Sequence, residues 1–294
     1  MNIPGKWIIF SLTIGLVGLF GWNHLTKPLG DQKVSFVPAL REAGTDGPLR
    51  YCVYRAPGGV NGDILYHLPG RNLDEQIWND NTYFTAMIQA QWADMKVKPP
   101  TVVCVSYGPV WLLAPKGRSE SSGLQEDFLV RMERIEARIG KPARRILMGE
   151  SMGGSNALIL ALSRPGRFAK VAALSPGVYV NSPFGFFSEL KAAVRRTGAD
   201  PKTAIGILLL ARKFVGNDKE WAAISPIQFM DTADRSFPEL YLSCGLYDKF
   251  GNFEGCSALA EKARFRGVSI AWHPMYGGHG AIDVPSLAEF LVRR

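Results

Sequence analysis

Short apolar runs alternate with segments of helical periodicity along most of this chain. A polar segment rich in Gly and Pro, residues 26–49, predicts a tether with a first strand. Apolar side chains recur at helical spacing from Leu73 to Met95 and from Gly123 to Ile139. Alternating strands and helices favour an α/β fold, with a mostly parallel central sheet and helices on both faces. Further strands are predicted at 50–56, 63–68, 101–107, 143–149, 170–175, 239–244 and 268–273.

The long interval from Val178 to Pro238 predicts an insert of its own, since it exceeds a simple connection between two strands. We expect a lid-like helical insert (178–238) after strand 6, walling an apolar pocket for an acyl or aryl group. An extra packing layer away from the site is the alternative. The interval contains a helix-like run, Thr203–Phe214, and the aromatic residues Phe184, Phe186, Phe187 and Trp221.

The most informative motif is Gly149-Glu150-Ser151-Met152-Gly153, where an apolar run stops and a helix-like segment begins. Gly-x-Ser-x-Gly between a strand and a helix is the sequence form of a nucleophile elbow, whose strained turn exposes the serine hydroxyl. The glycines lack a Cβ, so that strand and helix can approach closely. Ser151 is therefore the expected nucleophile, at a helix N-terminus that favours developing negative charge.

A serine hydroxyl needs a base to take its proton, and the chain offers 4 histidines. His24 follows an N-terminal apolar run, and His67 and His273 lie inside expected strands. His279 instead lies in a glycine-rich loop between the last strand and a C-terminal helix. A general base belongs on a loop that reaches over the sheet edge, so His279 is the candidate and a turn histidine the alternative.

The acid that orients this base should lie between Ser151 and His279 if the chain order is serine, acid, histidine. The run Glu239–Cys244 predicts a strand, and Asp248 follows it in a turn. We therefore expect Asp248 to be the acid, with a solvated turn aspartate as the alternative. The remaining aspartates of the interval lie in polar or helix-like segments typical of a surface: Asp200, Asp218, Asp231 and Asp234.

An oxyanion hole should combine the N–H after the serine, here that of Met152, with one from the loop after an earlier strand. The strand at 63–68 is followed by such a loop, in which Gly70 permits a close approach of the substrate to the backbone. We expect Arg71, in preference to Asn72, to supply the second N–H.

From about Asp63 to the C-terminus the chain resembles the esterase-D-type esterase family of α/β-hydrolases, which includes S-formylglutathione hydrolases, feruloyl esterases and mycolyltransferases. The resemblance implies the α/β-hydrolase fold, a triad of Ser151, Asp248 and His279, and an acyl-enzyme mechanism without metal or cofactor. The most specific likenesses are the runs Ser151–Gly154 and Gly245–Phe250. Others are Leu68-Pro69-Gly70, Arg164–Phe168, Ala173–Gly177 and Gly277-Gly278-His279.

Two positions depart from the pattern of that family. Its first oxyanion loop is commonly a His-Gly or Ser-Gly pair, and here it is Pro69-Gly70. The residue before the serine is Glu150, which we expect in the substrate-binding site. We expect the carboxylate of Glu150 either to disfavour anionic substrates in this site or to pair with an arginine. His67 is expected to pack near the site rather than to react.

The first 25 residues predict a signal peptide or signal anchor. Lys6 precedes an uncharged, mostly apolar run from Trp7 to Asn23. The run is short for a membrane span and lacks a clear cleavage site, so an uncleaved anchor is favoured over a cleaved signal, and a buried core helix is the alternative. We expect an exported protein, either membrane-anchored facing the periplasm or the extracellular side, or secreted.

The net charge of +8 favours contact with anionic surfaces such as lipid headgroups. Nucleic acid is not an expected partner, because the clustered arginines share a helix with Glu133 and Glu136, a pattern typical of a salt-bridged solvent face. These arginines are Arg131, Arg134 and Arg138.

The 4 cysteines show neither a Cys-x-x-Cys motif nor metal-ligand spacing. We expect buried apolar cysteines and no cysteine nucleophile. An exported chain can form disulfides, and the strand order would allow Cys52 to pair with Cys104.

The motifs together favour a serine carboxylic-ester hydrolase with a small-molecule or lipid ester as substrate. Two alternatives stay open. An acyltransferase would pass the acyl group from Ser151 to a sugar or lipid hydroxyl, because the chemistry is shared until the acyl-enzyme is discharged. A catalytically silent, anchored binding protein would keep the α/β-hydrolase fold without the activity.

Overall fold

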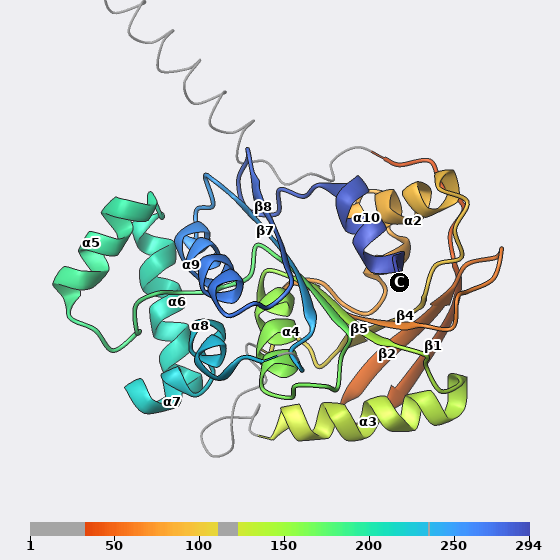
Figure 1. Ribbon diagram of the computed structural model, residues 1–294, viewed down its shortest axis with the longest axis horizontal. Coiled ribbons are helices and arrows are strands. Elements are labelled where there is room, and N and C mark those ends of the chain that lie inside the picture. The colour runs from red at the N-terminus through yellow and green to blue at the C-terminus, as the bar shows by residue number, and fades with distance from the viewer. Residues whose placement is uncertain (1–32, 111–122, 235) are drawn as a thin grey trace, which may run out of the picture.

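The computed structural model describes residues 33–110, 123–234 and 236–294 (Figure 1). Within these residues, eight strands form one sheet in the order β1-β2-β4-β3-β5-β6-β7-β8. The pairs β1–β2 and β2–β4 are antiparallel, and the other neighbouring pairs are parallel. The strands are β1 Leu40–Asp46, β2 Leu49–Arg55, β3 Ile64–Leu68, β4 Thr101–Ser106, β5 Arg145–Glu150, β6 Lys170–Leu174, β7 Glu239–Gly245 and β8 Ile270–Met275.

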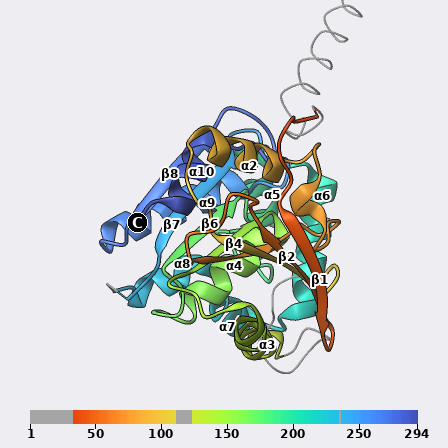
Figure 2. The ribbon, with the colours of Figure 1, turned by 90° about the vertical axis from the view of Figure 1, so that its right-hand side faces the viewer.

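The central strands are apolar along almost their whole length because helices cover both faces of the sheet. Strands β3, β4 and β6 consist entirely of buried residues. The seven strands expected from apolar runs are confirmed, with ends that shift by one or two residues. The first strand expected within residues 26–49 is β1, which pairs with β2 at the edge turned toward the viewer in Figure 2.

Helices α2 (Phe84–Asp94) and α10 (Val284–Val292) pack together on one face of the sheet (Figure 1). Helices α3 (Leu124–Ile139), α4 (Met152–Leu162) and α9 (Asn252–Phe265) cover the other face. A mostly parallel sheet between two helical layers places the carboxyl ends of β5, β6 and β7 along one edge, where sites form in such folds. The fold is that of the α/β-hydrolases, as expected.

One long helical segment joins β6 to β7 and lies beyond α4 and α9 rather than on the sheet (Figure 1). Among its described residues, α5 has no buried side chain and α6 has only that of Ala211. Its place in the chain, after the sixth strand, is the one that the sequence predicts for a helical insert. It consists of α5 Phe187–Thr197, α6 Pro201–Phe214, α7 Asp218–Ala222, α8 Pro226–Phe229 and the 3₁₀ helix η2 Met230–Thr232.

The prediction of one helix from Leu73 to Met95 is wrong. The segment forms a short 3₁₀ helix, η1 (Ile77–Asn79), then a turn, and only then α2. In the turn, Asp80 Oδ1 accepts hydrogen bonds from the backbone N–H and the hydroxyl of Thr82, at 2.8 and 2.7 Å. Such side-chain bonds offer the backbone an alternative to the helix, and apolar periodicity does not reveal them.

The arginines of α3 have polar partners, as expected for a salt-bridged face, but these partners are not Glu133 and Glu136. Arg131 Nε donates to Asp127 at 2.6 Å, and its Nη1 lies 3.0 Å from an oxygen of Asp46 on β1. Arg134 also reaches Asp46, and Arg138 donates to the hydroxyl of Tyr51. These bonds fasten α3 to the β1–β2 edge.

All four cysteines are buried and free. Cys52 and Cys104 face each other in the register of β2 and β4, yet they form no disulfide. The predicted signal or anchor segment, residues 1–25, lies outside the described residues. Among the helices that are described, none combines the length and the apolar character needed to cross a membrane.

Candidate active site

Ser151 occupies a strained turn between β5 and α4. Its φ of 54° and ψ of −118° lie outside the ordinary regions for a residue with a Cβ. The flanking glycines make this turn possible: a Cβ on Gly149 would lie 2.4 Å from the carbonyl carbon of Gly153, and a Cβ on Gly153 would lie 1.8 Å from the oxygen of Leu68. The strand–turn–helix context of a nucleophile elbow is therefore present.

Asp248, in the turn after β7, is fully buried and holds the ring of His279. Nδ1 of His279 lies 2.8 Å from Oδ2 of Asp248, and Oδ1 accepts a bond from the N–H of Phe250 at 2.8 Å. Cys244 Sγ and Asn252 Nδ2 approach Oδ2 at 3.6 and 3.5 Å. Since an ionised carboxylate only accepts, the contact assigns the ring proton to Nδ1 and leaves Nε2 as the acceptor.

The end of β6 connects the serine turn to the histidine loop. Ser151 N–H donates to the oxygen of Leu174 at 2.8 Å, and Ser175 Oγ accepts from the N–H of Gly280 at 3.1 Å. Asn252 Nδ2 donates to the backbone oxygen of Ser175 at 3.2 Å. Sequence reasoning missed Ser175 and Asn252, although Ser175 follows a strand and begins a Ser-Pro-Gly turn that could have marked it.

His279 lies at the surface of this arrangement with its ring partly open to solvent. Its side chain is 21% exposed, whereas that of Asp248 is 0% exposed. The Phe250 ring packs edge-on against the imidazole, with centroids 4.4 Å apart. In the part of the chain that the structure describes, the Ser151 hydroxyl makes no hydrogen bond, to His279 or to another group. Such catalytic bonds are often loose before substrate binds.

Glu150, beside the serine, turns its carboxylate inward and not toward an arginine. Oε1 accepts from the N–H of Gly70 at 2.7 Å, and Oε2 lies 2.8 Å from Nε2 of His67. Burial, together with the negative charge of this carboxylate, raises the pKa of the Tyr83 hydroxyl well above its ordinary value. With only 6% of Glu150 exposed, its oxygens serve partners inside the protein.

A buried thiol, that of Cys104, contacts the other ring nitrogen of His67. Cys104 Sγ lies 3.3 Å from Nδ1 of His67 and 3.8 Å from the oxygen of Asp74. Burial raises the pKa of the Cys104 thiol well above its ordinary value, so the proton stays on sulfur. The thiol therefore donates, Nδ1 of His67 accepts at the shorter distance, and the proton on Nε2 points to Glu150.

The residues expected to form the oxyanion hole lie at the same strand ends. Met152 is the first residue of α4, where an N–H has no partner within the helix. Gly70 and Met152 both line a small hollow of about 30 Å³ beside the serine turn. The N–H of Gly70 is taken by Glu150, whereas that of Arg71 has no acceptor among the described residues.

The other histidines and aspartates, for which the sequence predicts no catalytic role, have separate surroundings. His273 stacks on Tyr241, with ring centroids 4.5 Å apart, and burial lowers its pKa. The remaining histidine, His24, lies outside the described residues. The four aspartates taken as surface groups are exposed, and each has a local partner: Asp200 with Thr203, Asp218 with Ser182, Asp231 with Lys262 and Asp234 with Ser236.

The fold and the turn at Ser151 define the chain as a protein of the α/β-hydrolase class. The pattern of the family described as "Putative esterase" matches residues 48–283, so the chain belongs to this family of carboxylic ester hydrolases. A search of curated protein sequences found no match.

Solved structures similar to this chain include several esterases. A ferulic acid esterase shares 16% identity over 86% of this chain and 94% of its own, with a TM-score of 0.58. An S-formylglutathione hydrolase from Agrobacterium tumefaciens shares 17% identity over 88% and 95%, with a TM-score of 0.56. An esterase/lipase from an uncultured bacterium shares 19% over 88% and 86%, with a TM-score of 0.58. At such identities the similarity demonstrates a common fold.

Proposed function

We propose that the chain is a serine carboxylic-ester hydrolase that forms an acyl-enzyme on Ser151. His279 Nε2 takes the proton of the hydroxyl as the oxygen attacks the ester carbonyl, and Asp248 stabilises the imidazolium that forms. His279 then gives the proton to the leaving alcohol. Water, activated by the same imidazole, attacks the acyl-enzyme and releases the acid.

The oxyanion of the tetrahedral intermediate would be held by the N–H groups of Met152 and Arg71. Glu150 acts as a positioning residue in this proposal, not as a substrate contact. Its bonds to Gly70 and His67 fix the loop that carries Arg71. A fixed donor costs no reorganisation when charge develops, which is why such a loop needs internal support.

One observation carries the proposal: the partly exposed imidazole of His279 donates a hydrogen bond to the buried carboxylate of Asp248. The loop of this histidine is also bonded to Ser175, at the end of the strand that bonds to the strained turn of Ser151. Asp248 lies 31 residues from His279 in the chain. Convergence of an acid, a base and a serine from separate strand ends is typical of a catalytic triad.

The test is hydrolysis of p-nitrophenyl acetate by Ser151→Ala. We expect kcat/KM to fall by about 10⁴-fold or more, and a fluorophosphonate probe to label the wild type alone. Ser163→Ala is the matched control, because Ser163 lies at the far end of α4 and its hydroxyl donates to the backbone oxygen of Leu160 in that helix. It should keep both turnover and labelling. Equal turnover by Ser151→Ala and the wild type would refute the proposal.

A further inference from the structure

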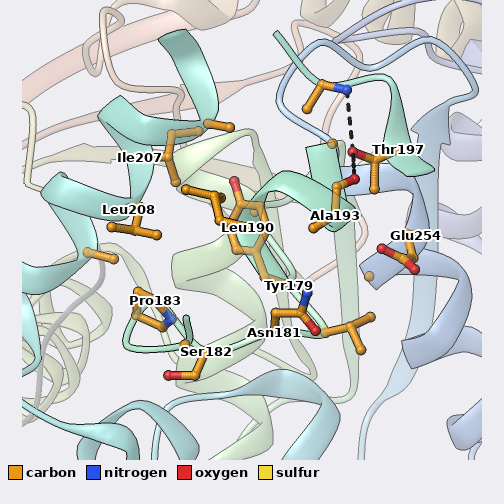
Figure 3. A pocket seen from close by; sticks show the side chains of 18 of the residues that line it. Tyr179, Asn181, Ser182, Pro183, Leu190, Ala193, Thr197, Ile207, Leu208 and Glu254 are labelled. Atoms are coloured by element: carbon orange, nitrogen blue, oxygen red, sulfur yellow. Dashed lines mark hydrogen bonds between the residues drawn. The ribbon is translucent and has the colours of Figure 1, made fainter. Parts of the chain in front are cut away.

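An apolar cavity of about 110 Å³ lies beneath helices α5 and α6 (Figure 3). The helices form one side of it, with Leu190 and Ala193 of α5 and Ile207 and Leu208 of α6 among the labelled side chains. Ile159 of α4 and Gly255 of α9 also line it, so the cavity lies between the insert and the body of the protein.

The apolar side chains of α5 and α6 are incompletely buried. Along α5, every described side chain keeps some exposure, and on α6 only that of Ala211 is buried. Leu190, Val194, Ile207 and Leu208 are half-buried because they face the cavity instead of a packed core. An amphipathic helix is stabilised mainly by burying its apolar face, so a ligand that fills the cavity would complete this burial.

The cavity adjoins the catalytic groups. Phe250 lines it and packs against the His279 ring at 4.4 Å. Gly177 also lines it, and its N–H donates to Ser155 Oγ, which in turn bonds to the backbone oxygen of Ser151. The cavity wall is therefore in direct contact with His279 and is linked by hydrogen bonds to the backbone of Ser151.

The carboxylates of Glu189 and Glu254 lie in the cavity wall. Glu254 pairs with Arg196 at 2.5 Å, and the exposed Glu189 accepts from the backbone N–H of Phe186 at 3.2 Å. Aliphatic side chains of α5 and α6 make up much of the wall. The lining favours a neutral, flexible hydrocarbon chain.

We propose that this cavity binds an unbranched aliphatic chain of the ester, supplied either by its acyl part or by its alcohol part. This inference rests on the proposed ester hydrolysis at Ser151. It adds the substrate class: esters with a chain of medium length should be preferred over acetates, because each methylene that enters the cavity leaves water.

The first test measures kcat/KM for two series of esters, p-nitrophenyl acyl esters from acetate to octanoate and acetates of alcohols from ethanol to octanol. In the wild type, one series should gain about fourfold for each methylene buried. Ala193→Phe, which fills the cavity, should abolish this gain. Ala192→Phe is the matched control, because Ala192 is exposed on the same helix and does not line the cavity.

The series that loses its gain in Ala193→Phe identifies the acyl or the alcohol part as the occupant. The proposal is overturned if neither series gains with length in the wild type, or if Ala193→Phe keeps the gain that Ala192→Phe shows.

A second test does not depend on turnover. Octanoate and 1-octanol are titrated calorimetrically into Ser151→Ala and into the double variants that add Ala193→Phe or Ala192→Phe. At least one ligand should bind Ser151→Ala and the Ala192→Phe double variant, and binding should be lost with Ala193→Phe. Absence of binding to Ser151→Ala overturns the cavity proposal even if the wild type hydrolyses esters. Binding by an enzyme that turns over no ester would uphold the cavity and refute the proposed function.

Discussion

Two carboxylate–imidazole pairs flank Ser151, and each has a nitrogen–oxygen distance of 2.8 Å. In the pair Asp248–His279 the ring is 21% exposed, and its Nε2 has no partner among the described residues. In the pair Glu150–His67 the ring is 0% exposed, and both of its nitrogens have partners. Both pairs have a short contact to a carboxylate, so access and a free Nε2 are what distinguish His279 as the general base that we propose.

The two pairs differ because of the elements that carry them. His67 and Glu150 lie on neighbouring strands, β3 and β5, where His67 faces Met148 in the parallel register. Both faces of these strands are covered, so the pair is sealed and can only support the backbone of Gly70. Asp248 and His279 lie in loops beyond the strand ends, where one side of the ring meets the site.

The largest effect is expected from replacing the two histidines, because His279→Ala should mainly reduce activity and His67→Ala should mainly reduce stability. His279→Ala should lower kcat/KM for p-nitrophenyl acetate by about 10⁴-fold and should destabilise the fold less than His67→Ala does, because water can replace a partly exposed ring as donor to Asp248. His67→Ala should instead destabilise the fold by about 3–5 kcal/mol, since it leaves a sealed cavity and removes a donor from the buried Glu150 carboxylate. Chemical denaturation and steady-state kinetics measure both quantities.

The folded fraction of His67→Ala should retain measurable turnover at low temperature, which provides the control for an indirect role. If His67→Ala lost activity as fully as His279→Ala while its unfolding curve stayed that of the wild type, the supporting role of His67 would be contradicted.

A second prediction applies the same change, carboxylate to amide, to both pairs. Asp248→Asn should lower kcat by about 10⁴-fold, because an amide can donate to Nδ1 and so move the ring proton to Nε2. Glu150→Gln should lower kcat by roughly 10-fold to 100-fold, since it loosens the loop that carries Arg71, the proposed oxyanion donor, without touching Asp248 or His279, and loss of a whole oxyanion donor costs about 10²–10³.

Steady-state kinetics with p-nitrophenyl acetate measures both variants, and the KM of Glu150→Gln should stay near that of the wild type. A fluorophosphonate probe should still label Glu150→Gln slowly. A fall in kcat equal to that of Asp248→Asn would contradict the positioning role and place Glu150 among the catalytic groups.

The smallest effect is expected for Cys104→Ser. A hydroxyl can replace the thiol as donor to His67 Nδ1, so kcat/KM should change by about twofold or less and the free energy of unfolding by about 1 kcal/mol. Cys104→Val, of similar size but without a donor, should cost more stability. Equal unfolding free energies for the two variants would show that the bond between Cys104 and His67 does not stabilise the fold.

The sequence alone determined those features that depend on neighbouring residues. Apolar runs predicted the strands, and Gly149 and Gly153 around Ser151 predicted the strained turn, because backbone conformation is governed by a few residues on either side. Local signals also selected Ser151 and His279 as candidates, whereas Asp248 was selected with the help of the chain order known for α/β-hydrolases. The helix expected over Leu73–Met95 failed because one side chain, that of Asp80, competes with the helix.

Only the tertiary structure decided which groups meet across the sheet. His67 and Glu150 are 83 residues apart, and Ser175 and Gly280 are 105 apart, and no local pattern records either contact. Strand order and register place these side chains together, and both depend on how the whole chain packs. The inward turn of Glu150 and the cavity beneath α5 and α6 follow from that packing, because burial is a property of the assembled layers.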